Sequence, residues 1–453
     1  MDERHQFGGR LGFILASAGA AVGLGNIWRF PYLAAKYGGG IFLLVYVIFC
    51  VTFGYTMVVA ETAIGRITRQ TPATAFAALT QNRLLRIGGW LNAIVPLLIA
   101  PYYSVIGGWV LKYFVAYLTG QGAALADDTA FSAFISSPVE AEIYFILFAA
   151  CTLGVIYLGV RGGIERVAKM AMPLLVVLAL LISGYICTRP GAGAGIRYYL
   201  VPDITKFSYK TLLAALTQMF FSLSIAMGIL ITFGAYMKRE VGIEDATFQI
   251  EIFDTGIAVL AGFMIIPAVF AYSGGDANAL SSGPSLMFVT IPKVFASMAG
   301  GGFVGGLFFA LVFFAALTSA IALAECSVSA LEERLHWSRS RSTIASFVFL
   351  VALGSLSCLG FGPLANVRIF GMQFLDFFDF ITNSVMMPAA ALAICLLITK
   401  VIGLERVAEE LEFGGQRFKL RPVFNFMIRW VCPICVIAVL IFSIASIMGL
   451  ISL

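Results

Sequence analysis

Five acidic side chains lie inside long apolar stretches of this chain, where an ionisable group is costly and usually marks a path for an ion or solute. They are Glu61, Asp254, Glu325, Asp376 and Asp379. The alternative is a side chain that reaches water at an interface or hydrogen-bonds a neighbouring helix. That alternative is favoured for Asp376 and stays open for Glu61. For Asp254 a functional role is favoured, because a polar, Gly-containing stretch (220–228) closely precedes it.

Backbone groups in the first apolar segment are a second source of chemistry. Gly19, Gly23 and Gly25 weaken a helix at a depth where no water is present to bond its amides and carbonyls. Such a break persists only if other partners satisfy the freed groups, and a bound cation together with an anionic solute would do so. The spacing therefore predicts a transporter.

Two further polar pairs lie within apolar segments, but neither is specific by itself. The pair Thr318-Ser319 is typical of hydroxyls that bond to the preceding helical turn. The pair Tyr102-Tyr103 is more typical of packing between helices.

The elements that position these groups are predicted to be membrane-spanning helices. Of 453 residues, 60% are hydrophobic and only 12% are charged, whereas about 25% are charged in an ordinary soluble domain. A chain this apolar must face lipid, and ~20 apolar residues suffice for one span. The sequence predicts an all-α integral membrane protein with eleven spans, at 11–34, 41–65, 87–118, 141–160, 165–187, 209–234, 248–272, 303–333, 343–361, 374–399 and 426–450.

Charge asymmetry predicts the orientation of these spans. If the N-terminus is cytoplasmic, 20 of the 29 Lys and Arg residues fall at that terminus or in loops on the same side. The loop between the third and fourth spans, on the opposite side, carries Asp127 and Asp128 but no Lys or Arg. We expect a cytoplasmic N-terminus and, because the number of spans is odd, a C-terminus on the outside.

The sixth apolar segment has a weak point like that of the first. Its middle, 220–228, reads Phe-Phe-Ser-Leu-Ser-Ile-Ala-Met-Gly. Interruptions five spans apart are typical of transporters built from two inverted five-helix repeats. We expect one transporter domain over 1–453, with repeats at about 4–188 and 205–400 and an extra span at about 426–450. The charged segment 401–423 is interpreted as a solvated cytoplasmic connector.

Several motifs resemble, in order, those of the neurotransmitter:sodium symporter family. The block from Arg10 to Pro31, with Gly23-Leu24-Gly25-Asn26 inside it, is highly specific. Further matches lie at 36–40, 61–66, 102–103, 220–224 and 314–319. Eleven spans resemble bacterial members of the family that handle hydrophobic amino acids. The resemblance implies the leucine-transporter fold, with discontinuous first and sixth helices, in a bacterial inner (plasma) membrane.

The resemblance implies two sodium sites and no organic cofactor. The ligands of the first would be the Ala21 carbonyl and the side chains of Asn26, Ser222 and Asp254. The substrate carboxylate would complete this shell, which makes ion and substrate binding mutually dependent. The ligands of the second would be the carbonyls of Gly19, Val22 and Ala315 and the hydroxyls of Thr318 and Ser319.

By the same resemblance, the substrate would be a zwitterionic amino acid, because opposite ends of two broken helices attract opposite charges. Its carboxylate would meet amides from Gly23 to Gly25 and the Tyr103 hydroxyl. Its ammonium would meet carbonyls near Ala21 and in the stretch 221–224, which includes Ser222 and Ser224. The side-chain pocket would be lined by Ile99, Tyr103, Phe221, Met227, Ser319 and Leu323. This apolar lining favours aliphatic, aromatic or sulfur-containing side chains.

The resemblance also implies a gate on each side of the substrate. The outer gate would consist of Arg29 and Asp379, above a lid of Tyr103 and Phe221, with Gln218 nearby. The inner gate would consist of Arg4 and Glu333, near Tyr236. Exposed pairs of this kind contribute ~0–1 kcal/mol, which is weak enough to break in each transport cycle.

Two positions depart from the family pattern in ways that matter. Asp254 supplies a fixed negative charge where animal members have a neutral residue and bind chloride, so chloride independence is implied. Ala226 lies where glycine is frequent, and its methyl group could reduce the side-chain size that the pocket accepts.

The leading interpretation is a sodium-coupled symporter for hydrophobic amino acids, with the lipid bilayer as its surroundings and no nucleic acid or obligate protein partner. The same fold could carry another amine or osmolyte, or couple to protons. Gates at both ends argue against an open channel. An intramembrane enzyme would need a nucleophile with a base or a metal cluster, and the sequence supplies neither.

Overall fold

The computed structural model describes residues 6–274 and 283–447. Within those ranges all regular elements are helical, apart from isolated bridges between Gly39 and Pro202 and between Ile369 and Met372. This confirms the predicted all-α fold class.

Nine helices in the described part of the chain are long and apolar enough to cross a membrane. Five of them run without a change of helix type: α6 (Arg83–Leu118), α8 (Pro138–Tyr157), α13 (Ile243–Ser273), α15 (Gly301–Leu335) and α16 (Arg339–Leu359). The other four include a π-helical stretch, where one turn is wider. The first consists of α3 (Gly40–Phe49), η3 (Cys50–Gly54) and α4 (Tyr55–Thr68), and the second of η5 (Val160–Glu165) and α9 (Arg166–Cys187). The third consists of α17 (Phe374–Phe380), η9 (Ile381–Met386), α18 (Met387–Leu397) and η10 (Ile398–Ile402), and the fourth of α20 (Arg421–Phe426), η12 (Met427–Val431) and α21 (Cys432–Ile447).

The two predicted interruptions are present as real breaks. Helix α1 (Arg10–Ala21) is followed after three residues by η2 (Gly25–Arg29) and α2 (Phe30–Lys36), and this pair is bent by 53°. Counted as one span, the pair raises the number of membrane-crossing helices within residues 6–274 and 283–447 to ten. The predicted sixth span is divided into α11 (Tyr209–Ser222) and α12 (Ile229–Tyr236), each of which is too short to cross a membrane alone.

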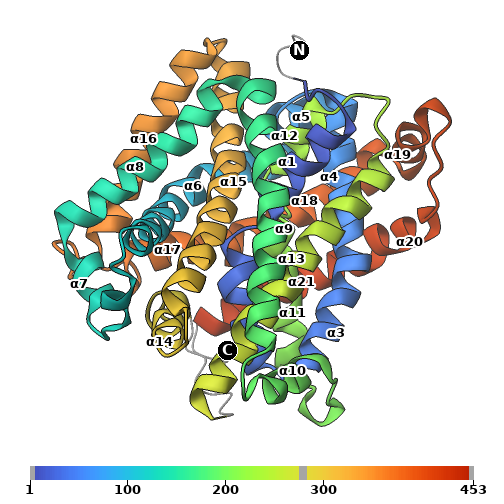
Figure 1. The fold of residues 1–453 in the computed structure, drawn as a ribbon. Coiled ribbons are helices and arrows are strands. Elements are labelled where there is room, and N and C mark those ends of the chain that lie inside the picture. Colours follow the sequence, from blue (N-terminus) through green and yellow to red (C-terminus); the bar gives the residue numbers. More distant parts are fainter. Residues whose placement is uncertain (1–5, 275–282, 448–453) are drawn as a thin grey trace.

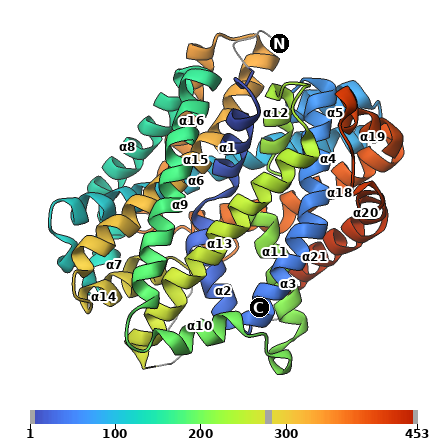
Figure 2. The ribbon, with the colours of Figure 1, turned by 45° about the vertical axis from the view of Figure 1, so that its right-hand side comes forward.

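The two broken segments lie side by side in the centre of the bundle. In Figure 2, α1 and α12 occupy the upper half and α2 and α11 the lower half. Helices α1 and α13 pack together, as do α1 and α15, while α8 and α16 form one flank (Figure 1). We call the end that carries α5 (Pro72–Leu79) and α12 the inner side, because the charge distribution predicts that it is cytoplasmic.

Short helices cover the ends of the bundle. On the outer side lie α7 (Ala130–Ser136), α10 (Ala192–Leu200) and α14 (Ile291–Ala296), together with the single turns η4 (Gly122–Ala126), η6 (Ile204–Lys206) and η8 (Leu286–Thr290). On the inner side, α19 (Leu404–Leu411) and η11 (Phe413–Gly415) follow the tenth predicted span.

The segment 401–423 corrects one interpretation of the sequence. It is not simply a solvated connector, because Val407, Ala408, Glu410 and Leu411 of α19 are buried. Helix α19 packs against α4, beside which it lies in Figure 1. The charges alternate along this segment, but one of them belongs to a buried ion pair described below.

Helices α4 and α12 are in backbone contact. A Cβ atom on Gly65 would lie 1.9 Å from the Ile231 carbonyl oxygen, and one on Gly234 would lie 2.5 Å from the Thr62 carbonyl oxygen. Neither position has room for a side chain. Two glycines, one from each helix, therefore allow the inner half of the sixth span to pack directly against the backbone of α4.

Candidate ion and substrate site

The break in the first span exposes backbone groups because the helix stops bonding to itself. Val22 N–H still donates to the Ala18 carbonyl, at 2.7 Å. The next two amides turn to side chains instead: Gly23 N–H donates to Asn26 Oδ1 at 3.0 Å, and Leu24 N–H to the Tyr103 hydroxyl at 3.2 Å. These two amides, which are predicted to bind the substrate carboxylate, thus make no helical hydrogen bond and lie near Tyr103.

Asp254 is the centre of a buried polar cluster. The Asn26 side-chain amide donates to Asp254 Oδ1 at 2.7 Å, to the Asp254 carbonyl at 3.2 Å and to Ser222 Oγ at 2.9 Å. Ser222 Oγ also lies 2.9–3.0 Å from both Asp254 carboxylate oxygens. All three side chains are no more than 1% exposed. The structure therefore brings together the three predicted side-chain ligands of the first sodium ion, from η2, α11 and α13.

This set of oxygen atoms suits a hard cation, which prefers carboxylate, hydroxyl and carbonyl ligands. In the structure, the ligand oxygens of Ser222 and Asp254 surround the Asn26 amide nitrogen. A sodium ion bound there would have to replace that nitrogen as the partner of these oxygens, with Asn26 turning its own oxygen toward the ion.

Tyr46 is a member of this cluster that the sequence analysis missed. Its hydroxyl donates to Ser222 Oγ at 3.0 Å and to Asp254 Oδ2 at 3.4 Å, and the side chain is fully buried. A tyrosine in an apolar span is ordinarily read as packing, so its residue type gave no signal. Only its polar partners, 176 and 208 positions away in the sequence, reveal its role.

The predicted second sodium site is centred on Ser319. Its hydroxyl oxygen lies 3.2 Å from the Gly19 carbonyl oxygen, and 3.1 Å from those of Ala20 and Val22. Three carbonyls of the broken helix therefore converge on one hydroxyl of α15. Ala20 was not among the predicted ligands.

The remaining two predicted ligands at this site differ in arrangement. The Thr318 hydroxyl donates to the Phe314 and Ala315 carbonyls of its own helix, at 3.0 and 3.1 Å. It follows the back-bonding pattern that is common for threonine in helices. Its Cβ atom nevertheless lies close to α1, since a Cβ on Gly19 would be 3.2 Å away from it.

A narrow cavity of about 20 Å³ lies between the two breaks. Ten of the eleven predicted substrate-binding residues line it: Ala21, Gly23, Gly25, Ile99, Tyr103, Phe221, Ser224, Met227, Ser319 and Leu323. The eleventh, Ser222, lies behind the cavity in the Asp254 cluster. Four further residues line the cavity: Ala20, Leu24, Asn26 and Ile229. None of the described residues that line it carries a charged side chain. Its volume is room for about one water molecule, so a bound amino acid requires the lining to move apart.

The break in the sixth span is held in an unusual backbone conformation. Ser224 and Ala226 have φ values of 53° and 59°, and Gly228 has a φ of 70°. Left-handed conformations cost roughly 1 kcal/mol each for residues other than glycine. Two contacts stabilise this segment: Ser224 Oγ donates to the Ala20 carbonyl at 3.2 Å, and Ala226 N–H donates to Glu61 Oε1 at 2.7 Å. The open question about Glu61 is thus answered by a structural contact to the break.

The predicted outer-gate residues lie close together above the cavity. The Arg29 guanidinium lies over the Phe221 ring, 5.3 Å from its centre. Asp379 accepts hydrogen bonds from the Tyr102 hydroxyl at 3.2 Å and from the Asn383 amide at 2.6 Å. No ion pair within 4.0 Å joins Arg29 to Asp379 among the described residues, although the two charges interact electrostatically. Gln218 donates to the Gly25 carbonyl at 3.0 Å.

Of the predicted inner-gate residues, Arg4 lies outside the described part of the chain. Glu333 accepts hydrogen bonds from Thr71 N–H at 2.8 Å and from the Thr74 hydroxyl at 2.7 Å. Tyr236 donates to Glu325 Oε1 at 2.9 Å. Glu333 and Tyr236 both line a cavity of about 1340 Å³ on the inner side, which is where an inner gate would lie.

Comparisons with known proteins agree with this geometry. Residues 4–126 and 128–451 match the sodium:neurotransmitter symporter family. The sodium-dependent transporter YhdH of Bacillus subtilis, described as uncharacterized, is 32% identical over 96% of this chain and 96% of its own length. The sodium- and chloride-dependent GABA transporter 2 of Rattus norvegicus is 26% identical, over 92% of this chain and 74% of its own.

The solved structures give the same answer for the fold. The crystal structure of MhsT in complex with L-phenylalanine matches this structure with a TM-score of 0.87. The two chains are 36% identical, and the match covers 97% of this chain and 99% of that one. With nearly the whole chain matched in both sequence and structure, this protein belongs to the sodium:neurotransmitter symporter family, a family of sodium-coupled transporters and not of enzymes.

Proposed function

We propose that the protein carries hydrophobic L-amino acids into the cell together with sodium, by exposing one central site alternately to each side of the membrane. The observation that carries this proposal is the uncharged cavity between two broken helices, next to the buried Asp254 cluster. Backbone amides and carbonyls can hold the two charges of a zwitterion. Ile99, Met227 and Leu323 give the lining an apolar part that can face its side chain.

The bound ligand of a similar structure supports this substrate class. MhsT was crystallised with L-phenylalanine, an amino acid whose apolar side chain matches the apolar part of this lining, although the cavity must widen to admit it. Met227 adds a flexible side chain that can adapt to several shapes. We propose one sodium ion at the Asp254 cluster and a second at Ser319, with transport independent of chloride.

Uptake of labelled amino acids into proteoliposomes tests the proposal directly. We expect accumulation of leucine, phenylalanine, tryptophan or methionine when an inward sodium gradient is present, and no accumulation of lysine or glutamate. Replacing chloride by gluconate should leave the rate unchanged. Equal uptake with and without the sodium gradient would contradict sodium coupling, and uptake of only another amine or an osmolyte would contradict the substrate class.

Replacing Ser319 by alanine tests the second sodium site. Ser319→Ala removes the hydroxyl on which three carbonyls of the first span converge, so we expect the sodium concentration for half-maximal uptake to rise about 3- to 10-fold, the size of one lost polar contact. Ser327→Ala is a matched control, since Ser327 is a buried serine of the same helix whose hydroxyl has no hydrogen-bond partner among the described residues. Unchanged sodium dependence in Ser319→Ala would remove this site from the proposal.

A further inference from the structure

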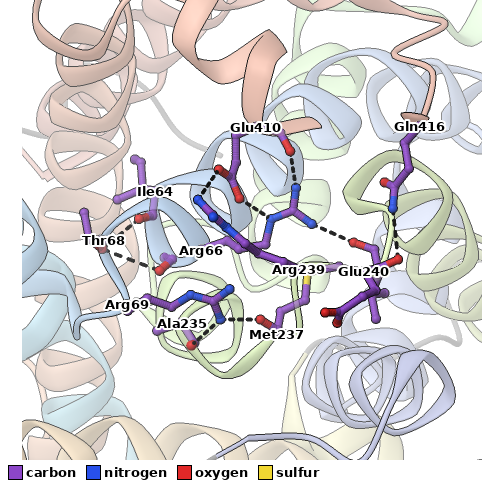
Figure 3. Close-up of polar contacts among 12 residues, drawn as sticks. Ile64, Arg66, Thr68, Arg69, Ala235, Met237, Arg239, Glu240, Glu410 and Gln416 are labelled. Atoms are coloured by element: carbon purple, nitrogen blue, oxygen red, sulfur yellow. Dashed lines mark hydrogen bonds and ion pairs between the residues drawn. The ribbon is translucent and has the colours of Figure 1, made fainter. Parts of the chain in front are cut away.

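A buried arginine on α4 binds the helix that follows the tenth predicted span. Arg66, whose side chain is fully buried, donates from Nε to Glu410 Oε1 at 2.7 Å. Its two terminal nitrogens donate to the Glu410 and Val241 carbonyls. Glu410 also pairs with Arg239, at 3.6 Å. We call Arg66, Arg239 and Glu410 the inner clamp; Figure 3 shows these three side chains converging.

The clamp includes the end of the broken sixth span. Val241 and Arg239 lie in the turn between α12 and α13, directly after the inner half of that span. Arg69, at the end of α4, donates to the carbonyls of Ala235 and Met237 at the end of α12 (Figure 3). With the glycine contacts described above, α4, α12 and this turn form one tightly bonded group, to which α19 is attached through Glu410.

A second carboxylate makes the same connection independently. Glu244, at the start of α13, accepts hydrogen bonds from the backbone amides of Lys419 and Leu420 at 2.8 and 2.9 Å. It also accepts the Tyr55 hydroxyl of α4 at 2.9 Å. The loop between the tenth and eleventh spans is therefore held at both ends by groups that belong to α4 and α13.

The helix before this loop reaches the outer gate. Residues Phe374–Ile402 form one membrane-crossing helix, and only Gly403 separates it from α19. Asp379 lies near its outer end, roughly 35 Å from Ile402 at 1.5 Å per residue. The same helix thus carries a gate residue at one end and the clamp just beyond the other.

We propose that Glu410 is a positioning residue for transport. By bonding Arg66 it fixes the inner end of the tenth helix to the α4–α12 group, and it thereby sets where Asp379 lies relative to Arg29 on the outer side. Movement of α12 at the inner side is then transmitted to the outer gate along a continuous helix. This inference rests on the proposed alternating exposure of the central site.

A double-mutant cycle tests the coupling between the two ends. Maximal uptake rates are compared for the native protein, Glu410→Gln, Asp379→Asn and the combination of both. We expect each single change to lower the rate about 10-fold, and the combination to lower it no further, because both changes disable one shared element. A combined loss of about 100-fold, the product of the two single effects, would overturn the proposal.

Two matched variants separate positioning from folding. Glu409→Gln removes an exposed charge of the same helix and should keep the uptake rate within about twofold of the native rate. Its effect should multiply with the effect of Asp379→Asn when the two changes are combined. Glu410→Gln leaves a buried arginine without its ion-pair partner, which can destabilise a fold. The double change Arg66→Met with Glu410→Met removes both charges instead. A native uptake rate in that variant, or in a folded Glu410→Gln protein, contradicts the role of the clamp.

The outcomes also distinguish this inference from the proposed function. If the native protein takes up none of the amino acids, the proposed substrate is wrong, and the cycle is repeated on the sodium-induced rise in melting temperature, which needs no substrate. The same lack of additivity is expected there. Independent, additive effects in that measurement reject the clamp whatever the substrate.

Discussion

Asp254→Asn should bind sodium at least about 30-fold more weakly than the native protein, because losing one partner of a buried charge pair costs 2 kcal/mol or more. Asparagine keeps the shape of the side chain but removes the only full negative charge in the cluster of Asn26, Ser222 and Tyr46. The measurement is the sodium concentration that gives half-maximal binding of a labelled substrate.

The control for this change lies on the same helix. Asp245→Asn removes an exposed carboxylate of α13 and should leave sodium dependence unchanged. Binding is measured in chloride and in gluconate, since a neutral side chain leaves the Tyr46 and Ser222 hydroxyls beside a site that lacks a negative charge. We expect chloride to restore part of the sodium affinity. If the sodium requirement of Asp254→Asn equals that of the native protein, Asp254 is not an ion ligand.

Gly65→Ala should strongly destabilise the folded protein, although it adds only one methyl group. The new Cβ atom would lie 1.9 Å from the Ile231 carbonyl oxygen and 2.8 Å from Ala235 N, so backbone atoms of α12 must move. Overpacking of this kind costs about 3 kcal/mol. We expect a lower melting temperature and loss of uptake, because α12 begins directly after the break that carries Ser224 and Met227.

A glycine that faces no neighbouring atom provides the comparison. No atom of the described residues lies within 4 Å of the position of a Cβ atom on Gly184 of α9, so Gly184→Ala should melt at or slightly above the native temperature. If Gly65→Ala melts with the native protein, the close contact between α4 and α12 is not a feature of the folded transporter.

The sequence predicted the first break well because the signal was local. Three glycines within seven residues, followed by Asn26 and Pro31, left little freedom for a continuous helix. The structure ends α1 at Ala21 and resumes at Gly25, within the predicted stretch. The side chains of Asn26, Ser222 and Asp254 contact one another in the structure. Their grouping was predicted from the resemblance and not from spacing, since they lie on three separate helices.

Long-range polar contacts were where sequence reasoning failed. Arg66 and Glu410 are 344 positions apart, and a charge in an inner loop is ordinarily solvated. The signal in α19 was its apolar spacing, Val407, Ala408 and Leu411, which marks a buried face beside Glu410. Tyr46 had no such signal. A buried hydroxyl in an apolar span becomes informative only when its partners are known.

The contact between Glu61 and Ala226 has a consequence for how a substrate is oriented. Alternating left-handed residues form a concave turn whose amides attract anions, and at the sixth-span break this turn already holds the Glu61 carboxylate. A second acidic group arriving there would have to compete with Glu61 for the Ala226 amide. Among the described residues, the amides at Gly23 and Leu24 have the neutral partners Asn26 and Tyr103. The proposed zwitterionic substrate would therefore place its negative end at the first span and its positive end toward the sixth. By occupying the amide at the sixth-span break, Glu61 thus determines which way round the proposed substrate lies in the binding site.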